Sequence, residues 1–467
     1  MYRMTPRLAL LICIAGALPP LAAELWVWGA GFDPLFGVPD ANKYYDPALM
    51  LLETGRYVIR MADGTLVPNL DTLPVYPYFL YFVFRLIGSV NYWVPAILQA
   101  GLAGLTCLAV GLAARSFNAA WMVPGALLCA VWLNLAYRPT HILNESLFML
   151  FFTWGLCALL WISHRQRVRS LLLLAGLAFG FAYMTRPVLL AFPYVVTPAL
   201  AYLLYRDVQM KWPQAIAWAL VPILLMMSFS LPNYVRSYVA YGTPYLTVQR
   251  GINLAYYYYP CLAARWGCGD VNTEAEFRLR KQIADALAAL PPDQRENVVV
   301  EDQIASTLAI AAILELGPAQ IARGIVGSML KLLLHTPVYE ILERFRLPTA
   351  YLGRMPGDND IARMGNFILA ILTTPTMLVW LIAQLALFAS RAVQMVGLWR
   401  LFADPATRAR TVLLFAYATA VLGVSISLGN PRYRVPLEPG LILLTLAGGV
   451  YLYRRWACRP QPDRLAP

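Results

Sequence analysis

Two carboxylates in this sequence have the type and position expected of groups that handle a proton. Asp40 lies in the segment Val38–Gly55, and Glu145 precedes an apolar run from Ser146 to Ser163. Carboxylates are the expected acid–base groups here because the whole chain has only three histidines. Asp40 and Glu145 are therefore the candidate catalytic residues.

The surroundings of Asp40 leave two roles open for it. Pro47 suits the first position of a helix and Gly55 suits its end, which makes Asp46 the expected N-cap. Asp40 lies six residues earlier and has no comparable structural task, and Tyr44 is close enough in sequence to shape a pocket beside it. Asp40 is thus either a general base or a turn residue.

Glu145 also has two interpretations. Acidic residues are favoured in the first turn of a helix, where they complement the helix dipole. A charged group that enters a bilayer nevertheless costs roughly 2–3 kcal/mol or more unless it has a partner, so such residues often belong to functional sites. The sequence does not decide between a helix start and a second catalytic carboxylate.

Arginines near the same expected helix ends are candidates for binding a phosphate. The planar guanidinium donates two parallel hydrogen bonds to an anion, which suits a phosphate group. The alternative role for each is an anchor at the membrane interface. The candidate substrate-binding residues are Tyr44 together with Arg56, Arg186, Arg236, Arg432 and Arg434.

The elements that must position these residues are membrane helices. The chain has 467 residues, of which 60% are hydrophobic and 13% charged, whereas a soluble domain carries about 25% charged residues. Apolar stretches of about 20 residues can cross a hydrocarbon core of roughly 30 Å as helices. The sequence predicts an all-α integral membrane protein with about ten spans: Leu8–Trp28, Trp93–Arg115, Ala120–Tyr137, Ser146–Ser163, Leu171–Tyr183, Leu189–Tyr205, Ala215–Leu231, Phe367–Ala389, Val412–Leu428 and Pro436–Tyr453.

The basic residues predict the orientation of these helices. With the N-terminus inside, the clusters around Arg3, Arg165, Arg206, Arg408 and Arg454 all fall in the cytoplasm, as the positive-inside rule requires. This distribution explains the net charge of +12 without nucleic acid as a partner. The first apolar run could be a signal peptide, but it continues far enough to span, so we expect an uncleaved helix.

Two large segments then lie on the extracytoplasmic side. Residues 1–231 form a membrane module whose first external loop, 29–92, carries Asp40; residues 232–363 form an external subdomain, and 364–467 hold the last spans. We expect helices lying in the outer interface at Val75–Gly88 and Ala319–His335, although the second could be an additional span. Cys261 and Cys268 fall in the external subdomain, where an oxidising compartment permits a disulfide.

These motifs resemble the membrane-embedded glycosyltransferases of the GT-C fold that use a polyprenyl-phosphate sugar donor, such as the protein O-mannosyltransferases and the lipid A aminoarabinose transferase. The most specific similarity is an Asp in the first external loop followed by Tyr, Ala and Gly, seen here as Asp40, Tyr44, Ala48 and Gly55. A Pro-Val-Tyr-Pro segment follows at 74–77. Weaker similarities are Asn144-Glu145, Thr185-Arg186-Pro187, Asn233-Tyr234 with Arg236, and Arg432-Tyr433 with Pro436.

The resemblance implies a mechanism and a set of partners. Asp40 would take the proton of an acceptor hydroxyl while the sugar leaves a lipid phosphate held by arginines, with inversion at the anomeric carbon. Glu145 would orient the acceptor or the base. A glycan, lipid or protein would be the acceptor. No nucleotide-binding motif or zinc-spaced cluster occurs in the sequence, although a divalent metal is not excluded. The alternatives are a flippase for a lipid-linked glycan and a glycan polymerase or ligase.

Overall fold

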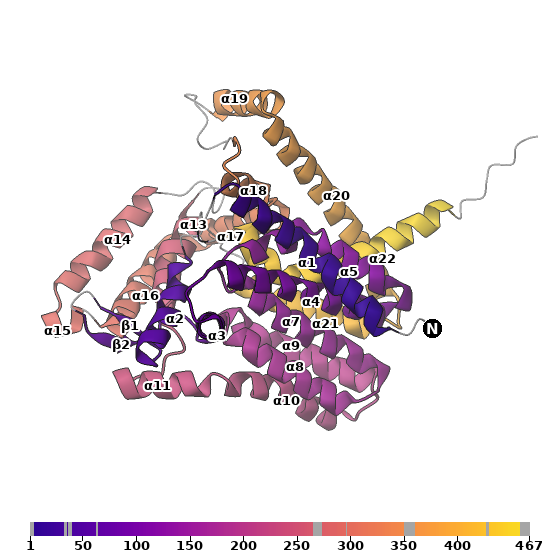
Figure 1. Cartoon of the computed structure of the whole chain (residues 1–467), viewed down its shortest axis with the longest axis horizontal. Helices are drawn as coiled ribbons and strands as arrows, with labels where there is room; N and C mark the ends of the chain where they lie inside the picture. Colours follow the sequence, from indigo (N-terminus) through magenta and orange to yellow (C-terminus); the bar gives the residue numbers. More distant parts are fainter. Residues whose placement is uncertain are drawn as a thin grey trace, which may run out of the picture.

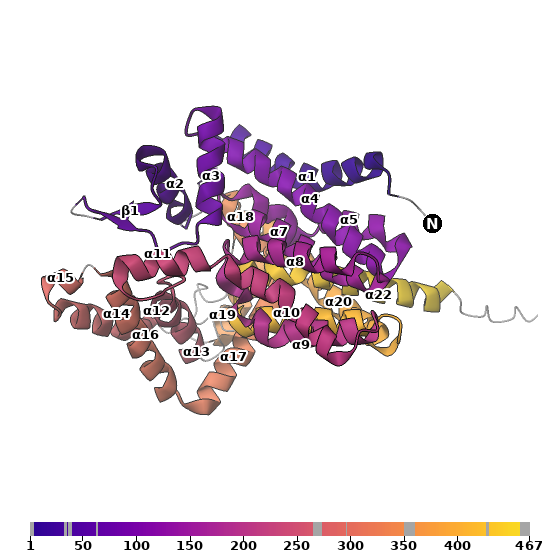
Figure 2. The same ribbon diagram turned by 90° about the horizontal axis from the view of Figure 1, so that it is seen from below.

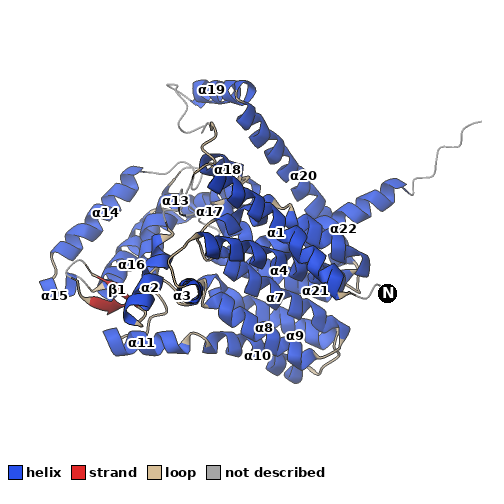
Figure 3. Cartoon of the chain, viewed as in Figure 1, coloured by secondary structure: helices blue, strands red, loops and turns tan. Residues whose placement is uncertain are grey.

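A computed structural model describes residues 4–31, 35, 40–61, 64–264, 273–295, 297–349, 360–425 and 429–457. These residues form helices almost throughout (Figure 3). A single hairpin of two short antiparallel strands, β1 (Val58–Arg60) and β2 (Leu66–Pro68), interrupts the helical structure in the described part of the chain. The all-α prediction is confirmed.

Most of the long helices form one bundle (Figure 1). Within it α1 packs on α4, α4 on α7, α7 on α8, α8 on α10, α10 on α9 and α9 on α21, while α20 packs on α22. The bundle helices are α1 (Pro6–Gly29), α4 (Trp93–Phe117), α5 (Met122–Ala130), α6 (Leu133–Tyr137), α7 (Glu145–Trp161), α8 (Val168–Tyr183), α9 (Phe192–Arg206), α10 (Trp212–Ser228), α20 (Pro375–Ala403), α21 (Arg408–Ser425) and α22 (Glu438–Ala457).

The lengths and hydropathy of these helices identify a multi-pass membrane protein. Six helices of the described residues are long and apolar enough to cross a membrane, and the number rises to nine if each bent pair of helices is one span. Within the described residues, each of the ten predicted segments falls mostly on helix, with short breaks at 131–132, 229–230 and 374. The sequence did not predict the bends, which reach 57° between residues 119–130 and 133–140 and 40° between α10 and α11 (Leu231–Tyr241).

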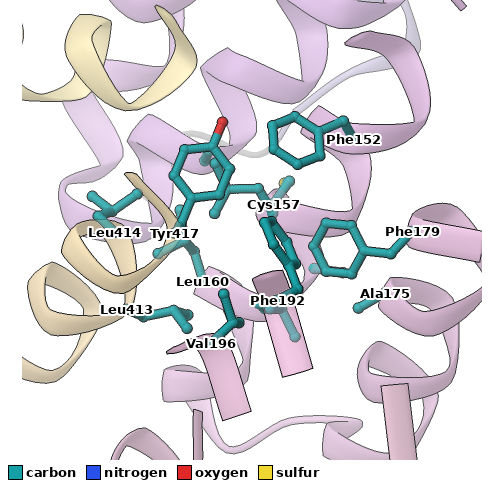
Figure 4. Close-up of a cluster of buried hydrophobic side chains, with 14 of the residues drawn as sticks. Phe152, Cys157, Leu160, Ala175, Phe179, Phe192, Val196, Leu413, Leu414 and Tyr417 are labelled. Carbon is teal, nitrogen blue, oxygen red and sulfur yellow. The ribbon is translucent and has the colours of Figure 1, made fainter. Parts of the chain in front are cut away.

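Aromatic side chains fill the centre of the bundle (Figure 4). Phe152 of α7 stacks on Tyr417 of α21 with ring centroids 5.0 Å apart, and it also meets Phe192 of α9 at 5.8 Å. Gly155 makes room for this packing, because a Cβ atom there would lie 2.6 Å from the ring of Phe179. The core thus fixes α7 and α21, two of the helices that lead to the candidate site.

The remaining elements gather at one end of the bundle (Figures 1 and 2). Two of them, α16 and α17, meet at an angle of 104°. These elements are α2 (Asn42–Thr54), α3 (Val75–Ile87), α11, α12 (Arg250–Asn253), the π-helix η5 (Leu254–Tyr258), α13 (Tyr259–Ala263), α14 (Thr273–Ala288), α15 (Pro292–Arg295), α16 (Val298–Glu315), α17 (Gly317–Leu334), α18 (Val338–Arg344) and α19 (Asp360–Thr373). Short 3₁₀ segments are η1 (Ala119–Trp121), η2 (Arg138–Thr140), η3 (Ile162–His164), η4 (Pro187–Ala191) and η7 (Pro431–Leu437).

Basic loops meet at the opposite end of the bundle. Arg165, between α7 and α8, donates a hydrogen bond of 2.6 Å to the carbonyl of Asp207 in the loop between α9 and α10. Arg206 in turn donates to the carbonyl of Pro405, between α20 and α21, at 2.5 Å. The loops that the positive-inside rule assigns to the cytoplasm are therefore neighbours in space, far along the helices from Glu145 at the start of α7.

The prediction that Asp46 caps a helix is wrong. Helix α2 begins at Asn42, so Asp46 lies inside it, although the helix does end at Gly55, which has a left-handed φ of 69°. Pro47 has no N–H to donate to the carbonyl of Lys43, four residues earlier. That carbonyl instead accepts a hydrogen bond of 3.3 Å from the Thr72 hydroxyl, so Pro47 is tolerated inside the helix. The sequence around Pro47 does not reveal this distant partner.

Candidate active site

Four residues from distant parts of the sequence meet where the bundle joins the additional helices. Asp40 precedes α2, Glu145 is the first residue of α7, Arg186 lies between α8 and η4, and Arg432 lies in η7. Asn144 fixes two of these positions relative to each other, because its side-chain amide donates 2.9 Å to the carbonyl of Thr185. The start of α7 and the end of α8 are thereby joined beside the site.

Arg432 bridges the two carboxylates. Its Nη1 atom lies 2.8 Å from Oδ2 of Asp40, and its Nε atom donates to Oε1 of Glu145. Arg186 donates to the same Glu145 oxygen at 3.2 Å. Glu145 is only 1% exposed, whereas Asp40 is 35% exposed. Glu145 is thus a buried anchor for two arginines, whereas Asp40 is accessible to solvent.

An open cavity lies in front of this cluster. Asp40, Arg186 and Arg432 line it, and they are joined by neutral polar and aromatic groups. Those groups include Tyr44, Thr72, Asn144, Thr247, Gln249, Asn253, Tyr257 and Tyr433. The cavity therefore combines cationic groups with the carboxylates of Asp40 and Asp71 and with hydroxyl and amide groups that can bind a sugar.

Tyr44 is held in the wall of this cavity by an aromatic and polar chain. Its ring packs edge-on against Tyr76 at 5.3 Å, and the Tyr76 hydroxyl donates 2.7 Å to Gln99 of α4. Burial raises the pKa of Tyr44, so its hydroxyl stays protonated and neutral at physiological pH. The structure thus places Tyr44 in the lining of the cavity.

Arg434 does not line the cavity. The side chain is 2% exposed and lies inside the protein, where Nε donates 2.7 Å to Glu438. Its Nη1 atom donates to the carbonyls of Leu332 and His335 at 2.8 and 2.9 Å. These contacts are structural, so the structure separates Arg434 from Arg432 although only one residue lies between them.

Arg236 and Arg56 also lie outside the cavity lining. Arg236 donates to the carbonyl of Asn69 at 2.5 Å and lies over the ring of Tyr57, with 4.8 Å between the guanidinium and the ring centroid. It therefore holds the β1–β2 hairpin against α11. Arg56 is exposed in the turn after α2.

Lys43 is a cationic site residue that the sequence analysis did not identify. Its ammonium group lies 3.6 Å from Oδ1 of Asp40, on the opposite oxygen from Arg432, and it lines the same cavity. Lys43 follows Asp40 by only three positions, but Asp40 precedes α2 and the sequence predicts a helix start only near Pro47, so the sequence gives no helical spacing that would pair them.

The predicted disulfide can be followed at one of its two cysteines. Cys261 is disulfide-bonded, and Cys268 lies outside the described residues.

Among the described residues, no group of three His, Cys, Asp or Glu side chains is arranged to hold a metal ion.

No protein-family model and no curated protein sequence matches the chain. Two solved structures of an oligosaccharyltransferase from Archaeoglobus fulgidus are similar to it. One is the archaeal oligosaccharyltransferase AglB in complex with an inhibitory peptide and a dolichol-phosphate, with 14% identity, a TM-score of 0.48, and coverage of 98% of this chain and 52% of that one. The other is tethered to an acceptor peptide, with 12% identity, a TM-score of 0.48 and coverage of 97% and 50%.

The chain thus spans about half the length of the two solved structures that it matches. The helices of this chain are those of a multi-pass, all-helical membrane protein, and a cavity lined by charged residues lies at one end of the bundle.

Proposed function

We propose that this protein is a GT-C-type glycosyltransferase that moves one sugar from a polyprenyl-phosphate donor to a glycan, lipid or protein acceptor. The observation that carries the proposal is the placement of a partly exposed carboxylate, Asp40, beside the cationic groups of Arg432 and Lys43 in one open cavity. A base next to an anion-binding site is what this transfer needs, because the nucleophile must lose a proton while the leaving group gains negative charge.

The donor phosphate would bind to Arg432, Arg186 and Lys43. All three line the cavity, and the two arginines are aligned by a shared carboxylate oxygen of Glu145. Preorganised cations of this kind stabilise charge that develops on a leaving phosphate without having to reorganise during the reaction. Glu145 acts in this account as an anchor for the arginines.

The transfer itself breaks one bond to the anomeric carbon and forms another. The acceptor oxygen attacks the anomeric carbon from the face opposite the phosphate, while its proton passes to Asp40. The bond between the anomeric carbon and the phosphate oxygen breaks, and both electrons leave with the polyprenyl phosphate. The product is a glycoside of inverted configuration, and Asp40 then returns the proton to solvent.

The ion pair between Asp40 and Arg432 couples donor binding to the release of the base. In the absence of donor, Oδ2 of Asp40 is occupied by Nη1 of Arg432 at 2.8 Å. An incoming phosphate competes for Arg432, which leaves this oxygen of Asp40 free to accept the proton of the acceptor hydroxyl. The site would then remain unreactive toward acceptors until the donor arrives.

We place the active site on the extracytoplasmic side of the membrane. The arginines of the loops at the opposite end of the bundle, such as Arg165 and Arg206, are the groups that the positive-inside rule retains in the cytoplasm. The disulfide at Cys261 supports the same orientation, since disulfides persist in oxidising compartments.

Purified protein in lipid nanodiscs, incubated with a panel of radiolabelled polyprenyl-phosphate monosaccharides and a membrane-glycan extract, tests the proposal. We expect one member of the panel to be consumed, with one sugar added per acceptor and free polyprenyl phosphate released. Movement of a lipid-linked glycan between leaflets without release of a phosphate lipid would show a flippase. Addition of whole glycan chains would show a ligase or polymerase.

A further inference from the structure

Arg432 owes its position to a buried network on the other side of the segment that carries it. In the 3₁₀ segment η7, two positions along the chain correspond to about 240° around the axis, so Arg432 and Arg434 leave it in different directions. Arg432 faces the cavity, whereas Arg434 is buried against Glu438. Buried contacts of Arg434 thus hold η7 in place, while Arg432 of the same segment lines the cavity.

Glu438 collects three donors in this network. Its Oε1 atom accepts from Nε of Arg434 at 2.7 Å and from the amide of Asn134 at 2.9 Å, and its Oε2 atom accepts from the indole of Trp132 at 2.6 Å. The side chain is fully buried. The same Asn134 amide group donates 2.9 Å to the carbonyl of Pro431, which directly precedes Arg432.

Arg434 extends the network to the end of α17. Its Nη1 atom meets the last carbonyls of that helix and the carbonyl of His335, which have no further helical turn to supply N–H donors. The backbone around Arg432 is therefore tied to α6 by Asn134 and to α17 by Arg434, and Glu438 neutralises the charge that this requires in the interior.

We propose that Glu438 and Arg434 are positioning residues that fix η7 so that Arg432 can reach Asp40 and Glu145 together. The expected effect of the network on turnover rests on the proposed function. The effect of the network on the order of η7 can be measured whether or not that function is correct. The network reaches the cavity only through η7, which carries Arg432 and Tyr433, because neither Glu438 nor Arg434 lines the cavity.

The substitution Glu438→Gln tests the network with little change in shape. A glutamine offers one acceptor oxygen, so its amide N–H groups must face one of the donors that the carboxylate now accepts. The least disruptive orientation turns the amide toward Trp132. Trp132→Phe removes that opposing N–H, so the double variant should recover part of the order of the segment, while Arg434 still lacks the negative charge of the carboxylate.

Hydrogen exchange and steady-state turnover are measured for Glu438→Gln and for the double variant Trp132→Phe/Glu438→Gln. The control is Thr445→Val, which lies farther along α22 and loses the hydrogen bond that Gln394 of α20 donates to Thr445. We expect Glu438→Gln to raise hydrogen exchange of the amides at 432–435 about tenfold and to lower kcat/KM about tenfold. The double variant should recover part of both losses relative to Glu438→Gln, and Thr445→Val should change neither. In an Arg432→Ala background, Glu438→Gln should have no further effect on turnover.

The results separate this inference from the proposed function. Unchanged exchange at 432–435 in Glu438→Gln, or an equal loss of turnover with and without Arg432, would overturn the positioning role. If the wild-type protein transfers no sugar, the proposed function fails, and the exchange measurement and its recovery in the double variant still decide whether the network holds the segment.

Discussion

The carboxylate of Asp40 lies 2.8 Å from the guanidinium of Arg432, although 392 positions separate them in the sequence. The contact links the first loop after α1 to the segment before the last helix, so the site exists only when both ends of the chain are folded. It also places a proton acceptor and a phosphate-binding group side by side, which is the central relationship of the proposed mechanism.

Arg432 should be the most sensitive of the cationic residues. Arg432→Ala is expected to lower kcat/KM for the donor about 100-fold, which corresponds to about 2.7 kcal/mol. Arg432→Lys should recover little of this loss, because a single ammonium group cannot reach Asp40 and Glu145 in parallel. Steady-state kinetics with the radiolabelled donor measures both effects.

Arg56→Ala is the matched control for this prediction, because Arg56 is exposed and lies outside the cavity lining. Its kcat/KM should remain within about twofold of wild type. Equal losses in Arg56→Ala and Arg432→Ala would contradict the assignment of Arg432 to the phosphate.

Removal of the buried charge at Glu145 should destabilise the protein as well as lower its activity. Glu145→Gln leaves the guanidinium groups of Arg186 and Arg432 without their shared carboxylate, and breaking a buried ion pair in this way costs roughly 3 kcal/mol or more. The exposed carboxylate of Glu53, which pairs with Arg60 at the surface, provides the control Glu53→Gln. Thermal unfolding in detergent should show a lower Tm for Glu145→Gln and an unchanged Tm for Glu53→Gln. A Glu145→Gln protein as stable and active as wild type would rule out the anchoring role.

Two consecutive glycines of α22 should respond differently to alanine. A Cβ atom at Gly448 would lie 2.0 Å from the carbonyl oxygen of Val393 in α20, whereas one at Gly449 would meet nothing within 4 Å. Gly448→Ala must therefore separate two closely packed helices, at a cost of about 1–3 kcal/mol. Gly449→Ala should be neutral or slightly stabilising, since alanine is the better helix former. Thermal unfolding of the two variants tests this packing, and equal Tm values would show that α20 and α22 lie farther apart.

The disulfide of Cys261 is predicted to join Cys268. Mass spectrometry of peptides digested without reductant should recover these two residues in one cross-linked species, while Cys107 and Cys129 of the bundle appear as free thiols after denaturing alkylation. A peptide that joins Cys261 to Cys458 would show a different pairing.

The sequence predicted the membrane helices, because these depend on a simple pattern. Apolar length located the spans, and alternation of the helices brought Asp40, Glu145, Arg186 and Arg432 to one end. It did not predict the direction of each side chain. Arg434 was indistinguishable from Arg432 in sequence, since the partner that buries it, Glu438, has an effect only once η7 is folded.

Longer-range contacts explain the remaining differences. The helix start at Asn42 depends on the Thr72 hydroxyl beneath Pro47, and the position of Arg236 depends on carbonyls of the β1–β2 hairpin. No local pattern around Pro47 or Arg236 encodes these partners.

The most direct test of the proposed function compares Asp40→Asn with Asp46→Asn in the donor-consumption assay. Asp46 lies on the same stretch of chain but outside the cavity that holds Arg432. We expect Asp40→Asn to lower kcat about 1000-fold, within the range seen for loss of a general base, with donor binding retained, and Asp46→Asn to stay within about twofold of wild type. An Asp40→Asn protein that transfers sugar at the wild-type rate would show that Asp40 is not the base.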